Sequence, residues 1–376
     1  MPSARSTRVR VWRLSFNPTS LVGAAAGCDL LILLLKTKIN RSSDRGPSLR
    51  QLLQVFWVLL VLVFSDAATL MLFPSDWLPQ APLELLQLDW LTTSGIEVAI
   101  LRLDQIDRLI SGNKWFKLTE HLKAADRTGA QGVISLGGAH SNHLHALAAA
   151  GERLGFETVG LLRGHPQQTP TVTDLQVFGM QLHWLGYGGY RARHEPGFWE
   201  PWQAQYPNLH AVPEGGGGLA GALGCKALKQ QVSYQLSTLG WNDFHGWWLA
   251  CGTGTTLAGL VLAEAGERPV YGALAVPDDH GVAPQVEAIV REAGLAVADY
   301  ALFDASRGGF AKVDPVLLEF IESTERSSGL PLEPLYTGKA LLALKEQIES
   351  GRFESGTRLI FVHTGGLQGR RGFITR

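Results

Sequence analysis

Short apolar runs alternate with segments of helical periodicity along most of the chain, and this alternation constrains the fold more than any other feature. Strands are predicted at residues 98–101, 132–136, 158–162 and 181–185, with helices at 118–127, 142–154 and 172–178 between them. A second series follows, with helices at 219–236, 257–265 and 282–293 and strands at 245–251, 270–276 and 359–363. Strands joined through helices lie parallel in a sheet that helices cover on both faces. The sequence therefore predicts an α/β fold with parallel or mostly parallel twisted sheets.

A glycine run at residues 213–218 separates the two series. Glycine clusters between periodic segments mark loops or turns. We interpret this run as the return of the chain from one domain to another, and a plain surface turn is the alternative. The 376 residues leave room for two domains.

The charge balance argues against a polyanionic partner. Charged residues make up 18% of the chain and the net charge is −1, so no general attraction for nucleic acid is expected. Cys28, Cys225 and Cys251 are far apart, odd in number and lack a Cys-x-x-Cys spacing. This pattern indicates neither a disulfide framework nor a zinc site, and it favours a reducing compartment such as the cytoplasm.

The first 75 residues differ from the rest of the chain. Residues 1–50 are rich in lysine and arginine, and residues 55–64 form an unbroken apolar run. A spanning helix needs roughly 20 apolar residues, and a signal peptide would lie closer to the start of the chain. We interpret the segment as an extension outside the fold, with translation starting near Met71. A membrane anchor that uses residues 52–73 and a helix packed on the fold are the two alternatives.

Two polar segments suggest a chemistry. Residues 111–118 place Lys114 beside a Gly-Asn turn, and residues 135–143 gather glycines, a serine, an asparagine and a histidine where a predicted strand meets a helix. A lysine amine forms a Schiff base with an aldehyde when burial or neighbouring groups lower its pKa. The pattern therefore suggests a pyridoxal phosphate enzyme, although a lone lysine in a loop is usually an exposed surface residue.

A third segment offers a site for the phosphate of such a cofactor. Residues 252–256 (Gly-Thr-Gly-Thr-Thr) form a predicted tight loop between the strand at 245–251 and the helix at 257–265. Glycines let the backbone approach an anion, and the N–H groups of a helix N-terminus and threonine hydroxyls bind it. Taken alone, the loop also fits an ordinary strand-to-helix connection.

Taken together, these segments resemble the 1-aminocyclopropane-1-carboxylate deaminase and D-cysteine desulfhydrase family, within the tryptophan synthase β-like group of pyridoxal phosphate enzymes. The resemblance runs from about Trp77 to the C-terminus. Its most specific parts are residues 102–104 with 112–114, then 137–142, 253–256 and 335–339. It implies two domains with pyridoxal phosphate in the cleft between them. The large domain would comprise residues 76–117 and 215–376, the small domain residues 118–214, and residues 1–75 would lie outside.

The resemblance also implies roles for single residues. Lys114 matches the Schiff-base lysine, which also acts as the base at the substrate Cα, and Lys117 matches a lysine near the phosphate. Ser141 matches a residue that binds the substrate carboxylate, and Asn142 one that holds the cofactor's ring hydroxyl. Because both begin a predicted helix, simple helix capping is the alternative for each. The phosphate would be bound by Gly252, Thr253, Gly254, Thr255 and Thr256.

Tyr336 and Thr337 bear on the choice of substrate. The resemblance implies that Tyr336 contacts the substrate and that residue 337 contacts the cofactor's pyridine nitrogen. Deaminases carry a glutamate at this second position, which keeps the nitrogen protonated, whereas desulfhydrase-type members carry threonine. A hydroxyl offers only a neutral hydrogen bond, so stabilisation of negative charge at Cα is weaker. Phe310 stands where the family has a second tyrosine. From the local sequence alone, Tyr336 also fits an aromatic residue packed in a proline-rich loop.

No metal site is expected. His140 replaces a glutamine usual in the deaminases and lies near His143 and His145, but no carboxylate or cysteine completes a ligand set at suitable spacing.

The predicted function is pyridoxal phosphate-dependent β-elimination from a small amino acid, D-cysteine above all, giving a keto acid, ammonia and sulfide. Ring-opening deamination of 1-aminocyclopropane-1-carboxylate is the first alternative. A pyridoxal phosphate-binding protein without turnover and a membrane-tethered sensor are alternatives of another class. The sequence leaves the oligomeric state open, with a homodimer as one option.

Overall fold

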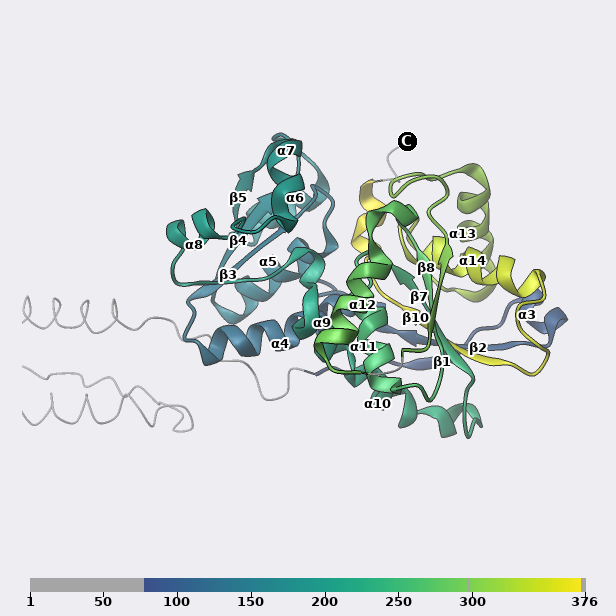
Figure 1. The fold of residues 1–376 in the computed structure, drawn as a ribbon. Helices are drawn as coiled ribbons and strands as arrows, with labels where there is room; N and C mark the ends of the chain where they lie inside the picture. The colour runs from purple at the N-terminus through teal and green to yellow at the C-terminus, as the bar shows by residue number, and fades with distance from the viewer. Residues whose placement is uncertain (1–77, 296–297, 373–376) are drawn as a thin grey trace, which may run out of the picture. The chain divides into compact units, whose positions relative to one another are not determined.

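A computed structural model of the chain describes residues 78–295 and 298–372. The predicted N-terminal extension, with its apolar run and the start near Met71, lies outside the described residues. The described part contains two sheets with helices packed on both faces, and the predicted α/β class is confirmed (Figure 1). Within this part, no helix is both long enough and apolar enough to cross a membrane.

The larger sheet has six strands in the order β1-β2-β10-β7-β8-β9. Its strands are β1 (Leu83–Leu85), β2 (Glu97–Arg102), β7 (Gly246–Cys251), β8 (Val270–Leu274), β9 (Tyr300–Asp304) and β10 (Arg358–His363). Strand β1 is antiparallel to β2, and every other neighbouring pair is parallel. The prediction of a mostly parallel sheet is therefore confirmed, while β1 and β9 were not predicted.

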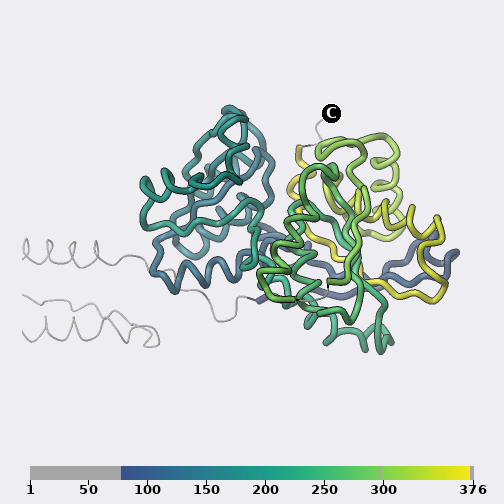
Figure 2. Tube along the Cα trace, in the orientation of Figure 1, coloured from purple at the N-terminus to yellow at the C-terminus, as the bar shows by residue number. Residues whose placement is uncertain are grey.

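The smaller sheet has four parallel strands in the order β5-β4-β3-β6. They are β3 (Gly132–Gly137), β4 (Glu157–Leu162), β5 (Gln181–Trp184) and β6 (Leu209–Ala211). The helices of this part are α4 (Asn113–Arg127), α5 (Asn142–Leu154), α6 (Pro170–Val177), α7 (Gly186–Arg191) and α8 (Glu200–Gln205). Figure 2 lets the chain be followed from β2 through α4 into this sheet and out again.

The remaining helices surround the six-stranded sheet. They are α3 (Asp89–Ser94), α9 (Gly218–Cys225), α10 (Ala227–Ser233), α11 (Thr255–Glu264), α12 (Val282–Glu292), α13 (Pro315–Ser328) and α14 (Thr337–Glu349). Short 3-10 turns are η1 (Leu103–Gln105), η2 (Ala192–His194), η3 (Glu214–Gly216), η4 (Leu236–Leu239), η5 (Asp278–His280) and η6 (Leu367–Gly372).

Strand β7 shows why both faces of the six-stranded sheet need cover. Successive side chains of a strand point to opposite faces. Trp247 lies in the core on the α11 side, and Trp248 lies in the core on the α14 side. Each buried indole N–H has a partner, since Trp247 donates to Glu264 at 2.8 Å and Trp248 to the Ala340 carbonyl at 2.8 Å. The strand is therefore apolar along its whole length, as expected for a parallel strand between two helical layers.

The predicted helix at 219–236 is broken into α9, α10 and the turn η4. The side chains of Gln231 and Gln235 bind the backbone just before and at β1: Gln231 bonds with Pro79 and Ala81, and Gln235 with Ala81 and Leu83. These contacts come from residues about 150 positions away, so the helical periodicity alone did not reveal the break.

The glycine run leads from β6 to α9, and α9 packs against both α4 and α11. The chain thus passes here from the four-stranded sheet to the helices of the six-stranded sheet. The predicted boundary between residues 117 and 118 falls inside α4. The exact division into a large and a small domain stays a prediction.

The chain crosses itself closely where α4 begins. Gly112 has a φ of 67°, and a Cβ built on it would lie 2.0 Å from the carbonyl oxygen of Thr364. The N–H of Asn113 donates to the same oxygen at 3.1 Å. Only glycine combines this left-handed conformation with so close an approach. The crossing fixes the start of α4, and with it Lys114, against the end of β10.

We expect Gly112→Ala to destabilise the protein much more than Gly129→Ala. The two glycines have φ values of 67° and 68°, but nothing lies within 4 Å of a Cβ at Gly129. Gly129→Ala should lower the free energy of unfolding by about 1 kcal/mol, the cost of the left-handed conformation. Gly112→Ala should lower it by about 3 kcal/mol or more, because overpacking against backbone is added. Urea denaturation measures both, and equal losses would show that the crossing has room for a methyl group.

Candidate functional site

Segments of the predicted site follow the carboxyl ends of strands in both sheets, namely β3 of the four-stranded sheet and β7 and β10 of the six-stranded sheet. Residues 138–141 follow β3, residues 252–254 follow β7, and residues 364–366 follow β10. The side chain of Asn113 reaches Thr256, and Gln368 reaches Asn142, so these segments meet. The carboxyl edge of an open α/β sheet is where ligands usually bind.

Lys114 is the second residue of α4, and its neighbour Asn113 holds it in place. The Nζ of Lys114 donates to Oδ1 of Asn113 at 2.9 Å, and Nδ2 of Asn113 donates to Oγ1 of Thr256 at 2.9 Å. Burial, together with the charge of Lys117, holds the pKa of Lys114 well below its usual value. A lysine with a lowered pKa presents a neutral, nucleophilic amine. Sequence reasoning did not assign this role to Asn113, although it stands beside Lys114 in the motif.

Lys117 lies one helical turn further on and faces the start of α11. Its Nζ donates to Oγ1 of Thr253 at 3.2 Å, and Oγ1 of Thr253 lies 2.9 Å from Oγ1 of Thr255. Burial lowers the pKa of Lys117 to about 8, so the ammonium form still prevails at pH 7. An ammonium group, hydroxyls and the free N–H groups of a helix N-terminus together suit an anion.

The five residues of the 252–256 loop differ in how far they are buried. Gly252 and Thr253 are partly exposed, whereas Thr255 and Thr256 belong to the first turn of α11 and are buried. Gly254 precedes the helix with a φ of 72°. The hydroxyl of Thr256 accepts the hydrogen bond from Asn113 and so supports Lys114 through that side chain. Direct binding of the cofactor by these five residues stays a prediction.

The glycine run lies against Lys117. A Cβ built on Gly216 would lie 3.2 Å from Cβ of Lys117, and one built on Gly215 would lie 3.1 Å from Cγ2 of Thr253. Glu214 anchors the run by accepting hydrogen bonds from the Tyr190 hydroxyl and from Nε of Arg193, the latter at 2.6 Å. The glycines thus bring bare backbone close to the lysine.

His143 faces this region with an unpaired nitrogen. Its Nε2 lies 2.8 Å from Oγ of Ser135, whose own proton goes to the Val212 carbonyl at 2.8 Å. Nε2 must therefore donate, and Nδ1 is an acceptor that is buried without a partner among the described residues. Burial, together with the charge of Lys117, holds the pKa of His143 well below its usual value. The imidazole is thus neutral, and its Nδ1 lies beside the glycine run, 3.4 Å from a Cβ built on Gly216.

Ser141 and Asn142 sit at the start of α5 as predicted. Oγ of Ser141 accepts from the Leu144 N–H at 3.2 Å, which is an N-cap hydrogen bond. Oδ1 of Asn142 accepts from Nε2 of Gln368 at 3.0 Å, and Nδ2 lies beside Gly366. Both side chains are partly exposed. The capping role is visible, and their contacts with substrate and cofactor stay predictions.

Tyr336 stands opposite the β7 loop. A Cβ built on Gly252 would lie 3.1 Å from its ring, and its ring centroid lies 5.4 Å from that of Phe310. Burial raises the pKa of Tyr336, so the phenol stays protonated. Its hydroxyl has no hydrogen-bond partner within the described chain. Tyr336 can therefore offer a hydrogen bond to a bound molecule.

Thr337 is turned inward. Its side chain is fully buried, and its hydroxyl accepts from the Glu333 N–H at 3.0 Å and lies 3.2 Å from Oε1 of Glu333. The Glu333 carboxylate also accepts the N–H groups of Leu335, Tyr336 and Thr337. Contact between Thr337 and the cofactor stays a prediction, and in this geometry its hydroxyl belongs to the turn. Sequence reasoning missed Glu333, although an acidic residue just before a helix is a recognisable capping signal.

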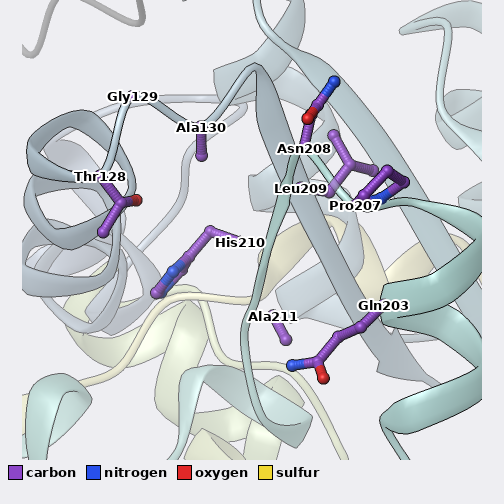
Figure 3. A pocket seen from close by; sticks show the side chains of 9 residues that line it. All are labelled: Thr128, Gly129, Ala130, Gln203, Pro207, Asn208, Leu209, His210 and Ala211. Carbon is purple, nitrogen blue, oxygen red and sulfur yellow. The ribbon is translucent and has the colours of Figure 1, made fainter.

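A cavity of about 270 Å³ lies elsewhere, at the opposite edge of the four-stranded sheet (Figure 3). It is lined by residues 128–130, which lead into β3, by Gln203, and by residues 207–211, which include β6. None of the predicted site residues borders it. Within residues 78–295 and 298–372, no group of three His, Cys, Asp or Glu side chains is arranged to hold a metal ion.

The donors and acceptors at the carboxyl edge fit a phosphate-bearing aldehyde. Lys114 supplies a poised amine, while Lys117, Thr253 and the start of α11 supply an anion site. Lys114 would hold the aldehyde carbon, and Lys117 with the α11 N-terminus would hold the phosphate.

Comparisons with known proteins agree with this chemistry. A family model described as "Pyridoxal-phosphate dependent enzyme" matches residues 78–365. A Pyrococcus furiosus protein with the provisional name 1-aminocyclopropane-1-carboxylate deaminase is 27% identical over 291 residues, which cover 73% of this chain and 86% of that protein. The mitochondrial bifunctional D-cysteine desulfhydrase/1-aminocyclopropane-1-carboxylate deaminase of Arabidopsis thaliana is 26% identical over 298 residues, covering 73% of this chain and 74% of its own.

Solved structures lead to the same family. The crystal structure of a 1-aminocyclopropane-1-carboxylate deaminase homologue is 25% identical, with a TM-score of 0.67, and covers 80% of this chain and 92% of that one. The matched family model spans well over half of the chain and includes every predicted site residue. The chain belongs to the pyridoxal-phosphate dependent enzyme family, and pyridoxal phosphate is its cofactor.

Proposed function

We propose that the protein eliminates a β-substituent from a small D-amino acid, with D-cysteine as the leading substrate, and releases a keto acid, ammonia and sulfide. The observation that carries this proposal is the set of groups around residue 337. A hydroxyl stands there, and the carboxylate of its turn, Glu333, is committed to three backbone N–H groups. With no carboxylate free on this turn, a neutral pyridine nitrogen is favoured, and negative charge at Cα is then stabilised less strongly. A good leaving group such as thiolate compensates for this, whereas a cyclopropane carbon does not.

When bound, pyridoxal phosphate would supply an electron sink for the substrate Cα, and the chain's own residues would move the proton and balance the charges. Lys114 is the candidate base, since its lowered pKa lets the free amine accept the Cα proton. Lys117 and the N-terminus of α11 balance the phosphate charge. Ser141, at the N-terminus of α5, is the candidate for the substrate carboxylate.

The Tyr336 hydroxyl is free to bind the substrate, and Phe310 packs against its ring. The Arabidopsis relative supports the proposal, because its name includes D-cysteine desulfhydrase. The two described cysteines, Cys225 and Cys251, are buried free thiols, in keeping with the cytoplasmic location that we also propose.

Ring-opening deamination of 1-aminocyclopropane-1-carboxylate is the second candidate. It is favoured by the names of the Pyrococcus and Arabidopsis relatives. The two reactions differ in the demand they make on charge stabilisation at Cα, so a direct comparison of substrates separates them.

We expect purified enzyme to release sulfide from D-cysteine with a kcat/KM at least about 10³ times that for 1-aminocyclopropane-1-carboxylate. Such a ratio corresponds to about 4 kcal/mol in the barrier, a reasonable effect of a neutral instead of a charged hydrogen bond. Keto acid and sulfide assays measure both reactions, with Lys114→Ala protein as the control for uncatalysed release. Efficient opening of the cyclopropane without elimination from any β-substituted amino acid would falsify the proposal and establish the second candidate.

Borohydride reduction of the holoenzyme should attach the pyridoxyl group to Lys114. The reason is that burial and the neighbouring charge make its amine the more nucleophilic of the two lysines. Peptide mapping by mass spectrometry locates the label. Lys117→Ala is the matched control and should keep the label on Lys114 while binding the cofactor more weakly. A label on Lys117 in the unaltered protein contradicts the assignment.

Lys117→Met should stabilise the cofactor-free protein at pH 7 and weaken its stabilisation by pyridoxal phosphate. The pKa of Lys117 is about 8 in the folded state against 10.5 for an unperturbed lysine. Below pH 8 the folded state therefore carries the full cost of the buried charge, up to about 3 kcal/mol. This cost fades as the pH rises from 8 to 10.5, so the gain from the substitution should fade with it.

Urea denaturation at several pH values, with and without cofactor, measures both effects of Lys117→Met. The cofactor stabilises the folded state in proportion to the logarithm of its affinity, so a lost phosphate contact appears as a smaller shift. A gain in stability that is the same at pH 7 and at pH 10.5 would show that the charge of Lys117 is not its cause.

A further inference from the structure

Lys339, near the start of α14, is a buried lysine that the chemistry described above does not use. Its side chain is 1% exposed, and its Nζ donates to the carbonyl oxygens of Ser306, Gly309 and Phe310 at 2.8, 2.9 and 3.0 Å. An ammonium group has three N–H donors, and all three are used. The lysine therefore closes a cage made of backbone oxygens.

A cation is an unexpected choice at this position of a helix. Lys339 is the third residue of α14, where the helix dipole disfavours positive charge. Burial lowers the pKa of Lys339 to about 8, so the group still carries its charge at pH 7. A buried charge persists only when its partners compensate for lost water. Here the compensation comes from the carbonyl cage, and the Glu333 carboxylate adds to it.

The caged segment has a strained backbone. Arg307 has a φ of 54°, and Gly308 follows with a φ of 80°. A left-handed conformation is costly for arginine and persists only where the surroundings impose it. Ser306 O also accepts from the Gly309 N–H and Gly309 O from the Lys312 N–H, but Phe310 O has Lys339 as its one partner within the described residues. Lys339 is thus the hydrogen-bond donor that holds the Phe310 carbonyl.

Phe310 links the cage to the functional site. Its ring packs edge-on against Tyr336, with 5.4 Å between ring centroids, and Tyr336 in turn borders Gly252. Phe310 is therefore the contact between the 306–310 segment and the Tyr336 ring.

We propose that Lys339 is a positioning residue, whose ammonium acts as a built-in monovalent cation in a three-carbonyl cage and holds the 306–310 segment, and through Phe310 the Tyr336 ring, in place. Carbonyl oxygens at 2.8–3.0 Å are also the surroundings that suit a potassium or ammonium ion. The contacts of the cage thus do not depend on which reaction the enzyme catalyses. Only the effect of Lys339 on turnover rests on the proposed function.

The test compares Lys339→Ala and Lys339→Met in the full-length holoenzyme. Both substitutions remove the ammonium, but alanine leaves space for a free ion, and methionine fills that space. We expect amide hydrogen exchange at residues 306–310 to speed up about tenfold or more in both variants, and Tm to fall by about 5 °C. Ammonium or potassium chloride should reverse at least half of both changes in Lys339→Ala, whereas choline chloride at equal ionic strength should not. Neither salt should rescue Lys339→Met.

Lys345→Ala is the matched control, because Lys345 lies on the same helix and pairs with Glu349 at the surface. It should leave exchange at 306–310 unchanged. Unchanged exchange in both Lys339 variants, equal rescue of Lys339→Ala by choline and ammonium, or failure of both variants to fold even in ammonium would each overturn the proposal.

Turnover gives a separate readout. The Lys339→Ala enzyme should lose kcat/KM while its cofactor absorbance stays normal, and ammonium should restore it in parallel with the exchange rates. If the enzyme proves to act on another substrate, the exchange and Tm results still decide the role of the cage. If those results hold while kcat/KM for a verified substrate is unaffected, the Tyr336 part of the proposal is wrong.

Discussion

Asn113 is the residue on which the arrangement of the site depends. Its backbone N–H binds the Thr364 carbonyl at the end of β10, its Nδ2 binds Thr256 at the start of α11, and its Oδ1 binds Nζ of Lys114. One residue therefore fixes the start of α4 to the end of β10 and to the start of α11, and holds the Lys114 amine. Gly112 makes this possible, because a side chain there would collide with the same carbonyl. The backbone crossing thus explains the glycine and asparagine of the Gly-Asn-Lys motif, as the chemistry explains its lysine.

The site gathers buried charge at a cost in stability. Lys114, Lys117 and Lys339 all have pKa values lowered by burial, and Glu333 has a raised one. Each such shift means that the folded state disfavours the charged form, so the cofactor-free fold is less stable than an apolar site of the same shape would be. The neutral His143, with its bare acceptor, limits the positive charge while keeping a polar contact available. A phosphate bound beside Lys117 would compensate its buried charge, so cofactor binding and folding would stabilise each other.

The sequence predicted most of the fold and the composition of the site, but not how its members are connected. Helix α5 matches its predicted range of 142–154, because Ser141 is a local capping signal and the apolar periodicity is clear. The start of α4 was missed, since Gly112 and Asn113 look like a turn until Thr364, some 250 positions away, supplies the partner. The same holds for the broken helix at 219–236, where glutamine contacts with the segment before β1 decide the outcome. Local sequence signals predict a helix where its hydrogen-bond partners lie nearby in the sequence. They fail where a distant segment provides the partner.

The turn from Glu333 to Thr337 limits which side chains position 337 can carry. Thr337 is fully buried, and Glu333 already places a carboxylate beside it, with three backbone N–H groups as its ligands. A second carboxylate at position 337 would meet the first at close range without water, and two carboxylates that close do not both ionise. A glutamate there would therefore need a different residue at 333 and a different cap for α14. The side chain at position 337 is in this way coupled to the turn that precedes α14, and the Glu333 charge in that turn also acts on Lys339.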